Sequence, residues 1–251
     1  MDNTKIAWTD ATWNPVTGCT KVSPGCDNCY AERITKRFKR GDFSDVVFHE
    51  DRLDQPKRWH RPRMIFVNSM GDTFHSSVTD EQIALMFDAM LAAPQHTYQV
   101  LTKRPNRVRR WWKWYSEKYF TVTTAFKLEW PQNIWLGTSV ESAKYLPRID
   151  RIAGIAPVTF ISAEPLLGPL VTGNPAGDLE GYLGAGMIQW VIVGGESGPD
   201  FRPMSDGWAA DIQNECWVHG VPFFFKQRAG NRPGHHPELD GKTWEEMPNG
   251  R

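Results

Sequence analysis

The sequence has no long hydrophobic run. No apolar stretch among its 251 residues approaches the roughly 18–20 residues that a membrane-spanning helix needs. The first ten residues, MDNTKIAWTD, also lack the charged-then-apolar pattern of a secretory signal peptide. We therefore expect a cytoplasmic protein that makes no contact with a membrane.

A net charge is missing as well, because 29 Lys and Arg residues balance 29 Asp and Glu residues. This balance argues against a protein that coats nucleic acid through bulk positive charge, but it is compatible with a local basic patch. Glycine (21 residues) and proline (18 residues) together stay well below the roughly 25–30% that is typical of low-complexity chains. Length and composition therefore favour one large folded domain.

Cysteine is scarce. Four cysteines in a chain of this length are too few for a disulfide scaffold. Three of them, Cys19, Cys26 and Cys29, crowd into residues 19–29, which indicates metal or redox chemistry in a reducing compartment. Cys216 lies far along the chain on the apolar stripe of a predicted helix, so we expect it to be a small buried core residue.

Short apolar runs recur about every thirty residues, which is the length of a βα unit with its crossover helix. The runs are continuous rather than alternating, as in parallel strands that are covered on both faces. We predict an α/β fold, a single partial TIM-like (β/α) barrel of about six or seven parallel strands over residues 1–229, followed by an extended C-terminal tail over residues 230–251. The predicted strands are an early one near Ala11–Pro15 and the runs Met64–Val67, Tyr98–Leu101, Ile134–Leu136, Thr159–Ile161, Trp190–Val193 and Val221–Phe225.

Two helices between these strands have recognisable starts. Thr79 precedes Asp80 and Glu81, and Ser205 precedes Asp206, so each helix has a capping residue followed by acidic residues in its first turn. The segment that follows each predicted strand is polar or rich in glycine. Because the carboxyl ends of parallel strands meet on one rim of a barrel, these segments predict an active site there.

The cysteine cluster has the spacing C-x6-C-x2-C. Thiolates are soft ligands, and such a triad suits zinc or an iron–sulfur cluster. A structural zinc site normally takes four protein ligands, and no fourth cysteine or histidine lies near this loop. Three thiolates are what a [4Fe–4S] cluster needs when one iron is left to bind a substrate or cofactor. A zinc knuckle completed by an aspartate or a distant ligand is the alternative.

Several motifs along the chain resemble a known family. Trp8-Thr9-Asp10-Ala11-Thr12-Trp13-Asn14-Pro15 runs into the cysteine cluster, and the chain then carries Leu101–Pro105, Gly137–Glu141, Ile161–Leu166, Val193–Gly198 and Phe225–Gln227. Together they resemble a phage-associated three-cysteine family of unknown function that is itself similar to radical S-adenosylmethionine (SAM) enzymes. Most radical SAM enzymes use C-x3-C-x2-C, so the first gap here is longer.

The resemblance implies a [4Fe–4S] cluster on Cys19, Cys26 and Cys29, with SAM as the second cofactor. It implies that electron transfer from the cluster cleaves SAM to methionine and a 5′-deoxyadenosyl radical, which abstracts hydrogen from the substrate. A flavodoxin- or ferredoxin-type protein would supply the electron. By strand order, the residues expected to contact SAM are Ser69, Gly71, Asp72, Ser139, Glu141, Gly194 and Gly195.

Charged residues at the predicted rim are candidates for substrate contact. Glu164, Glu196 and Lys226 are the predicted catalytic residues, although an isolated rim charge is often only solvated or ion-paired.

Residues 103–118, KRPNRVRRWWKWYSEK, interleave basic and aromatic side chains. Cations reach phosphates and aromatic faces stack on bases, so this segment is a candidate surface for single-stranded or flipped-out nucleotides. The alternative is an amphipathic helix whose tryptophans pack inward and whose arginines face water. The candidate nucleic-acid residues are Lys103, Arg104, Arg107, Arg110, Trp111 and Trp112.

These observations favour a radical SAM-type enzyme that modifies or repairs a nucleic acid base or a nucleotide. Two alternatives stay open. One is a zinc-stabilised nucleic-acid-binding protein without catalysis, and the other is a radical SAM enzyme that acts on a small molecule or a peptide.

Overall fold

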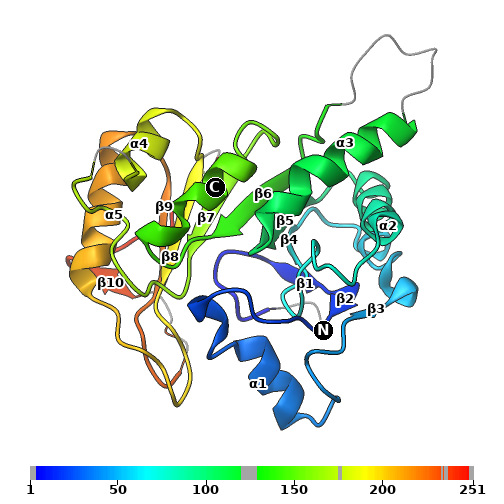
Figure 1. The fold of residues 1–251 in the computed structure, drawn as a ribbon, viewed down its shortest axis with the longest axis horizontal. Coiled ribbons are helices and arrows are strands. Elements are labelled where there is room, and N and C mark those ends of the chain that lie inside the picture. Colours follow the sequence, from blue (N-terminus) through cyan, green and yellow to red (C-terminus); the bar gives the residue numbers. More distant parts are fainter. Residues whose placement is uncertain (1–3, 120–128, 175–176, 233, 235–236, 249–251) are drawn as a thin grey trace.

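Seven parallel strands form one curled sheet, a half-barrel, in this computed structural model (Figure 1). The structure describes residues 4–119, 129–174, 177–232, 234 and 237–248. The strands lie in the order in which they occur along the chain: β1 (Ala11–Trp13), β4 (Met64–Val67), β5 (Thr97–Thr102), β6 (Ile134–Ser139), β7 (Thr159–Ala163), β8 (Trp190–Gly194) and β9 (Phe223–Gln227). The predicted partial barrel is therefore confirmed.

Helices surround this sheet. Figure 1 shows α2 (Asp80–Leu91) and α3 (Val108–Tyr119) beside its first half, and α4 (Leu179–Gly184) and α5 (Asp206–Val218) beside its second half. The helix α1 (Tyr30–Arg37) starts directly after Cys29. Five 3-10 helices complete the helical elements of the described residues: η1 (Pro24–Cys26), η2 (Glu50–Arg52), η3 (Pro56–Arg58), η4 (Pro105–Arg107) and η5 (Ala143–Arg151).

The predicted helix starts agree with this structure. Thr79 caps α2 through its hydroxyl, which accepts from the backbone of Gln82, while the Gln82 side chain accepts from the backbone of Thr79. This reciprocal capping satisfies two of the backbone N–H groups that a helix start leaves free. Ser205 precedes α5, but its side chain makes no capping hydrogen bond.

Both faces of the sheet are buried, which explains why its strands are apolar without alternation. One face packs against the helices through residues such as Ile65, Val67 and Val191. The other face is filled by aromatic rings, among which Trp8 packs on Phe66 with ring centroids 4.6 Å apart. Because side chains fill this interior, space for a ligand is left at the strand ends.

The C-terminal tail is more ordered than the extended surface segment that the sequence predicts. It forms a hairpin of β10 (Glu238–Leu239) and β11 (Lys242–Thr243), and Leu239 is buried. Beyond the hairpin, the backbone N–H of Phe225 donates to the carbonyl of Trp244 at 2.8 Å. The tail therefore covers the outer edge of β9, which would otherwise expose unpaired backbone groups.

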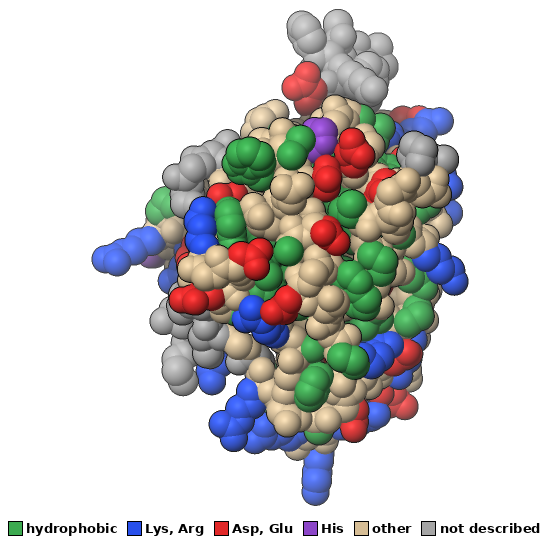
Figure 2. All heavy atoms as spheres, turned by 90° about the vertical axis from the view of Figure 1, so that its left-hand side faces the viewer, with side chains coloured by type: hydrophobic (Ala, Val, Ile, Leu, Met, Phe, Trp, Pro, Cys, Tyr) green, Lys and Arg blue, Asp and Glu red, His purple; other side chains and the backbone are tan. Residues whose placement is uncertain are grey.

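A second small hairpin joins β2 (Val16–Thr17) to β3 (Val47–Phe48) near the start of the sheet. Among the described residues, no helix is both long and apolar enough to cross a membrane. On the face that carries α4 and α5, acidic and hydrophobic side chains intermingle and basic ones lie mainly toward the edges (Figure 2). This face is therefore not a uniformly basic surface for nucleic acid.

Candidate functional site

Residues 18–29, which we call the cysteine loop, extend across the carboxyl end of the half-barrel. The loop leaves the sheet at Gly18, whose N–H donates to the carbonyl of Met70 at 2.9 Å and which forms a parallel bridge with Gly71. It ends at Cys29, where α1 begins. Between these points it contacts side chains that follow β4, β5, β6 and β8.

The segment after β6 holds the middle of the cysteine loop. The Ser23 hydroxyl donates to Glu141 Oε1 at 2.5 Å, and Arg148 Nη1 donates to Glu141 Oε2 at 2.8 Å. Glu141 is fully buried. Because both of its oxygens are engaged, the buried carboxylate fixes the loop against η5.

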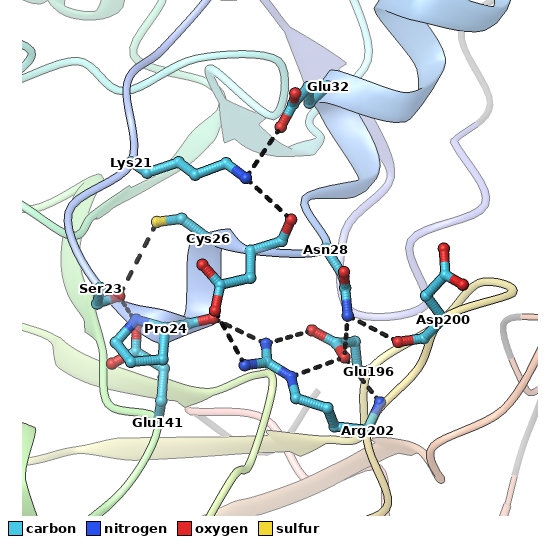
Figure 3. Close-up of polar contacts among 11 residues, drawn as sticks. Lys21, Ser23, Pro24, Cys26, Asn28, Glu32, Glu141, Glu196, Asp200 and Arg202 are labelled. Carbon is cyan, nitrogen blue, oxygen red and sulfur yellow. Dashed lines mark hydrogen bonds and ion pairs between the residues drawn. The ribbon is translucent and has the colours of Figure 1, made fainter.

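The segment after β8 holds the second half of the cysteine loop (Figure 3). Glu196 accepts from Asn28 Nδ2 at 2.9 Å and from Arg202 Nη2 at 2.6 Å. Arg202 also donates to the carbonyl of Pro24 at 2.8 Å and to Asp27 Oδ2 at 3.3 Å. Arg202 thus links the buried carboxylate of Glu196 to two points on the loop.

The electrostatics at Glu196 follow from these contacts. Burial favours the neutral carboxyl group, but hydrogen bonds from Arg202 and Asn28 outweigh it and hold the pKa of Glu196 below its usual value. The carboxylate is therefore charged at neutral pH and remains an acceptor for the loop.

The first half of the cysteine loop is held from the segments after β4 and β5. Arg104 Nη2 donates to the carbonyl and to the hydroxyl oxygen of Thr20, both at 2.8 Å, and His75 Nε2 lies 2.9 Å from the same hydroxyl. Burial, together with the charge of Arg104, lowers the pKa of His75. Because a neutral imidazole does not repel the guanidinium, both groups can hold Thr20.

Arg104 also lies 4.0 Å from Cys19 Sγ. Burial, aided by the charge of Asp72, raises the pKa of the Cys19 thiol to about 11, although Arg104 opposes this shift. In the absence of a bound metal the thiol is therefore protonated at neutral pH, and a ligating metal would have to displace that proton.

All three clustered cysteines line one cavity of about 210 Å³, together with Lys21 and Glu32. Cys26 Sγ lies 3.9 Å from the Ser23 hydroxyl (Figure 3). Within the described part of the chain, the three sulfurs are not all within 4.8 Å of one another, so they are not gathered as the ligands of a single metal ion would be. The fold thus brings the predicted ligands to one cavity without closing them around a common centre.

The fourth cysteine has the predicted structural role. Cys216 lies on the buried side of α5 and is 1% exposed, and burial raises its pKa strongly. Over the described ranges, one set of three side chains has potential ligand atoms within 4.8 Å, and it consists of Glu180, Glu215 and His219 on and after α4 and α5. Among the described residues, no two thiols of the cysteine loop therefore share that spacing with a third thiol, a carboxylate or an imidazole.

Comparison with known proteins identifies the family. A family model described as protein of unknown function (DUF5131) matches residues 3–248. The chain belongs to the DUF5131 family. No curated protein and no solved structure matched the chain.

In this DUF5131 chain, the predicted SAM contacts after β4 are engaged with other protein groups. Asp72 is buried and accepts from the Thr102 hydroxyl at 2.7 Å and from the Lys103 N–H at 3.1 Å. The Ser69 hydroxyl donates to Asn14 Oδ1 at 3.1 Å. Gly71 pairs with the start of the cysteine loop, so this segment positions the loop.

The other predicted SAM contacts lie on the same rim. The Ser139 hydroxyl accepts from Lys103 Nζ at 3.1 Å. Gly195 exchanges hydrogen bonds with Gln227, one from its N–H and one to its carbonyl, both at 2.8 Å. A Cβ at position 194 would lie 3.3 Å from the Glu164 side chain, so the glycine leaves room for that carboxylate.

The structure separates the three predicted catalytic residues. Glu164 and Lys226 form an ion pair at 2.5 Å, with side chains 20% and 18% exposed. Glu196 lies under the cysteine loop and is occupied by Arg202 and Asn28. Glu164 and Lys226 remain candidates for substrate contact, whereas the contacts of Glu196 position the loop.

In the basic and aromatic segment after β5, some of the predicted nucleic-acid residues are buried or ion-paired and others are accessible. Trp111 is fully buried against Phe87 and Tyr115, so the prediction that it stacks on a base is wrong and the inward-packing alternative holds for it. Arg107 pairs with Asp80. Arg110 is exposed, and Trp112 is half-buried.

Sequence reasoning missed the residues that hold the cysteine loop. Arg202, Asn28 and Ser23 were not among the predicted site residues, although Arg202 follows Glu196 by six positions. Ser23 and Asn28 lie within the cluster itself, where their proximity to the cysteines is the available signal. Arg104 was predicted to contact nucleic acid, and in this structure it binds Thr20 of the loop instead.

Proposed function

We propose that this protein is an iron–sulfur enzyme of the radical SAM type. The observation that carries the proposal is that three thiols face one cavity in a loop laid across the carboxyl end of a parallel half-barrel. Cys19, Cys26 and Cys29 are the residues that would hold a [4Fe–4S] cluster.

The donor set agrees with such a group. A single tetrahedral zinc ion would bring its thiolates within about 3.8 Å of one another, given Zn–S bonds of about 2.3 Å. The described sulfurs are spread more widely than the 4.8 Å that one small ion would allow, but all three border the same cavity. Thiolates without a fourth protein ligand favour an iron–sulfur cluster with one open position.

When bound, a cluster of this type supplies the electron that cleaves SAM and so starts hydrogen abstraction from a substrate. The chain's own residues bind and position. Glu141 and Glu196 fix the cysteine loop on the rim, Arg104 lies beside Cys19, and the aromatic interior excludes water beneath the site.

The substrate side of the proposed site is the rim between β7 and β9. Glu164 and Lys226 lie there as a partly exposed ion pair that can hold or move a proton at the Glu164 carboxylate. The proposed substrate is a nucleic acid base or a nucleotide, and the proposed electron donor is a flavodoxin- or ferredoxin-type protein. Arg110 and Trp112 keep accessible surface for such a substrate on α3.

Anaerobic purification tests the proposal. The expected result is a brown protein with about four irons per chain that forms 5′-deoxyadenosine from SAM when a reductant is added. Cys26→Ala should lose both the iron and the SAM cleavage. The matched control is Cys216→Ala, which should keep both because Cys216 belongs to the core.

Two outcomes would contradict the proposal. Colourless protein loaded with zinc would favour the alternative, a zinc-stabilised nucleic-acid-binding protein without catalysis. Fully reconstituted iron–sulfur protein that leaves SAM intact would exclude the radical SAM reaction.

A further inference from the structure

A second cavity lies beside the cysteine loop on the same rim. It has a volume of about 340 Å³ and lies between Pro24 of the loop, the start of η5 at Lys144 and Tyr145, and Arg202 and Pro203 after β8. We call it the rim cavity. Its volume is at the lower end of the roughly 300–1,000 Å³ of small-molecule sites, so it suits one nucleotide-sized unit.

The charge of the rim cavity is positive. Glu141 borders it, but the oxygens of that carboxylate are engaged by Ser23 and Arg148. Lys144 is exposed, and no carboxylate oxygen of the described residues lies within 4.0 Å of its ammonium group. Lys144 therefore supplies a cation that is not already committed to an internal ion pair.

Part of the wall of the rim cavity is apolar and includes the ring of Tyr145. The ring of Tyr145 is held by Arg148, whose guanidinium lies 4.3 Å from the ring centroid. Pro24, Leu167 and Pro203 supply the remaining apolar surface. A planar aromatic group fits against such surfaces, since every base has an apolar π-face.

A cation beside an aromatic ring and apolar side chains suits an anion that is attached to a planar ring. We infer that the rim cavity binds a nucleotide, with its phosphate at Lys144 and its base against Tyr145 and the prolines. The inference deepens the proposed function, on which it rests for the reaction, by placing the substrate's nucleotide next to the cysteine loop. Because Pro24 and Arg202 belong both to this cavity and to the contacts of the loop, a bound nucleotide would touch the segment that carries Cys26.

Nucleotide binding can be measured without SAM turnover. The probes are adenosine 5′-monophosphate, adenosine, and a fluorescent single-stranded tetranucleotide, titrated by calorimetry or anisotropy into the full chain with its iron content recorded. The monophosphate should bind on the order of tenfold more tightly than adenosine, as expected for one added charge-assisted contact. Lys144→Glu should remove that tenfold difference and leave the affinity for adenosine unchanged.

Two variants of Tyr145 test the contact between its ring and the base. Tyr145→Ala should weaken both the monophosphate and adenosine, whereas Tyr145→Phe should retain both affinities. Lys57→Glu, an exposed lysine in η3, is the matched control and should bind like the wild type. If the tetranucleotide binds more tightly than the monophosphate, with the same dependence on Lys144, the natural ligand is a nucleic acid strand. If the two bind equally tightly, the natural ligand is a free nucleotide.

Equal affinities for the monophosphate and adenosine, or an unchanged preference in Lys144→Glu, would overturn the inference. The two proposals fail separately. If iron-loaded protein that cleaves SAM shows no preference for the monophosphate, nucleotide binding in the rim cavity alone is overturned. If anaerobically purified protein contains no iron but still binds the nucleotide, the iron–sulfur function alone is overturned.

Discussion

The hydroxyl of Ser23 donates a 2.5 Å hydrogen bond to the carboxylate of Glu141, which lies 118 positions further along the chain. Gly25, two residues after Ser23, lies so close to the same carboxylate that an added Cβ would be 2.5 Å from Glu141 Oε1. The position of the cysteine loop thus depends on a contact that leaves no room for a side chain at residue 25.

Gly25→Ala should loosen the cysteine loop. Glu141 is fully buried and held by Arg148, so it cannot move aside freely and the Ser23 contact should break. Loss of a hydrogen bond to a charged group costs about 1.5–3 kcal/mol. Urea unfolding measures the effect, and a wild-type free energy of unfolding for Gly25→Ala would refute this account.

Glu196→Gln should change how stability depends on pH. Because the pKa of Glu196 in the folded protein lies below its ordinary value of 4.5, its contribution is complete above pH 4.5 and is lost as the pH falls through the lowered pKa. The variant should be less stable at pH 7, by about 1–3 kcal/mol, with a smaller further loss on acidification. Denaturation curves between pH 3 and 7 test this, with the exposed Glu117→Gln as control. Parallel pH profiles for wild type and Glu196→Gln would contradict it.

Gly195→Ala should destabilise the end of β8. A Cβ at this position would lie 2.1 Å from the backbone nitrogen of Ala229, and backbone atoms cannot yield as a flexible side chain can. We expect a loss of about 1–3 kcal/mol by thermal unfolding. Gly181→Ala in α4 has open space around its Cβ and should instead gain up to about 1 kcal/mol. A stability for Gly195→Ala equal to that of the wild type would show that β8 and β9 are not packed as described.

Trp111→Ala should unfold the protein rather than weaken nucleotide binding selectively. The ring is fully buried against Phe87, and removal of a buried tryptophan costs about 3–5 kcal/mol. Arg110→Ala, its exposed neighbour, should change stability by no more than about 0.5 kcal/mol. A stable Trp111→Ala variant would contradict the inward packing of α3.

The strands of the half-barrel could be predicted because their signal is local. Met64–Val67 is apolar at each position, and β4 has these bounds. A strand that is buried on both faces needs such an apolar run, and nearly every βα unit of the chain has one. The three cysteines could be assigned to one site for the same reason, since their spacing alone keeps them within one loop.

The contacts of the site could not be predicted, because they depend on which side chains meet across the rim. Glu141 and Glu196 were expected to contact SAM and substrate, and each holds the cysteine loop. Nothing local distinguishes an arginine such as Arg202, which bridges two elements, from one that is solvated. In α3, sequence alone left two orientations of the tryptophans open, and packing against Phe87 decides between them for Trp111.

The distance along the chain between the cysteine loop and its anchors has a consequence for biosynthesis. Asn28 is made early, but its partner Glu196 emerges from the ribosome 168 residues later, and Arg202 follows Glu196. Until then the second half of the loop lacks the anchors that follow β8. The proposed cluster site therefore gains its last anchor only after residue 202 of 251 has been synthesised, although Arg104 and Glu141 are already available to hold Thr20 and Ser23.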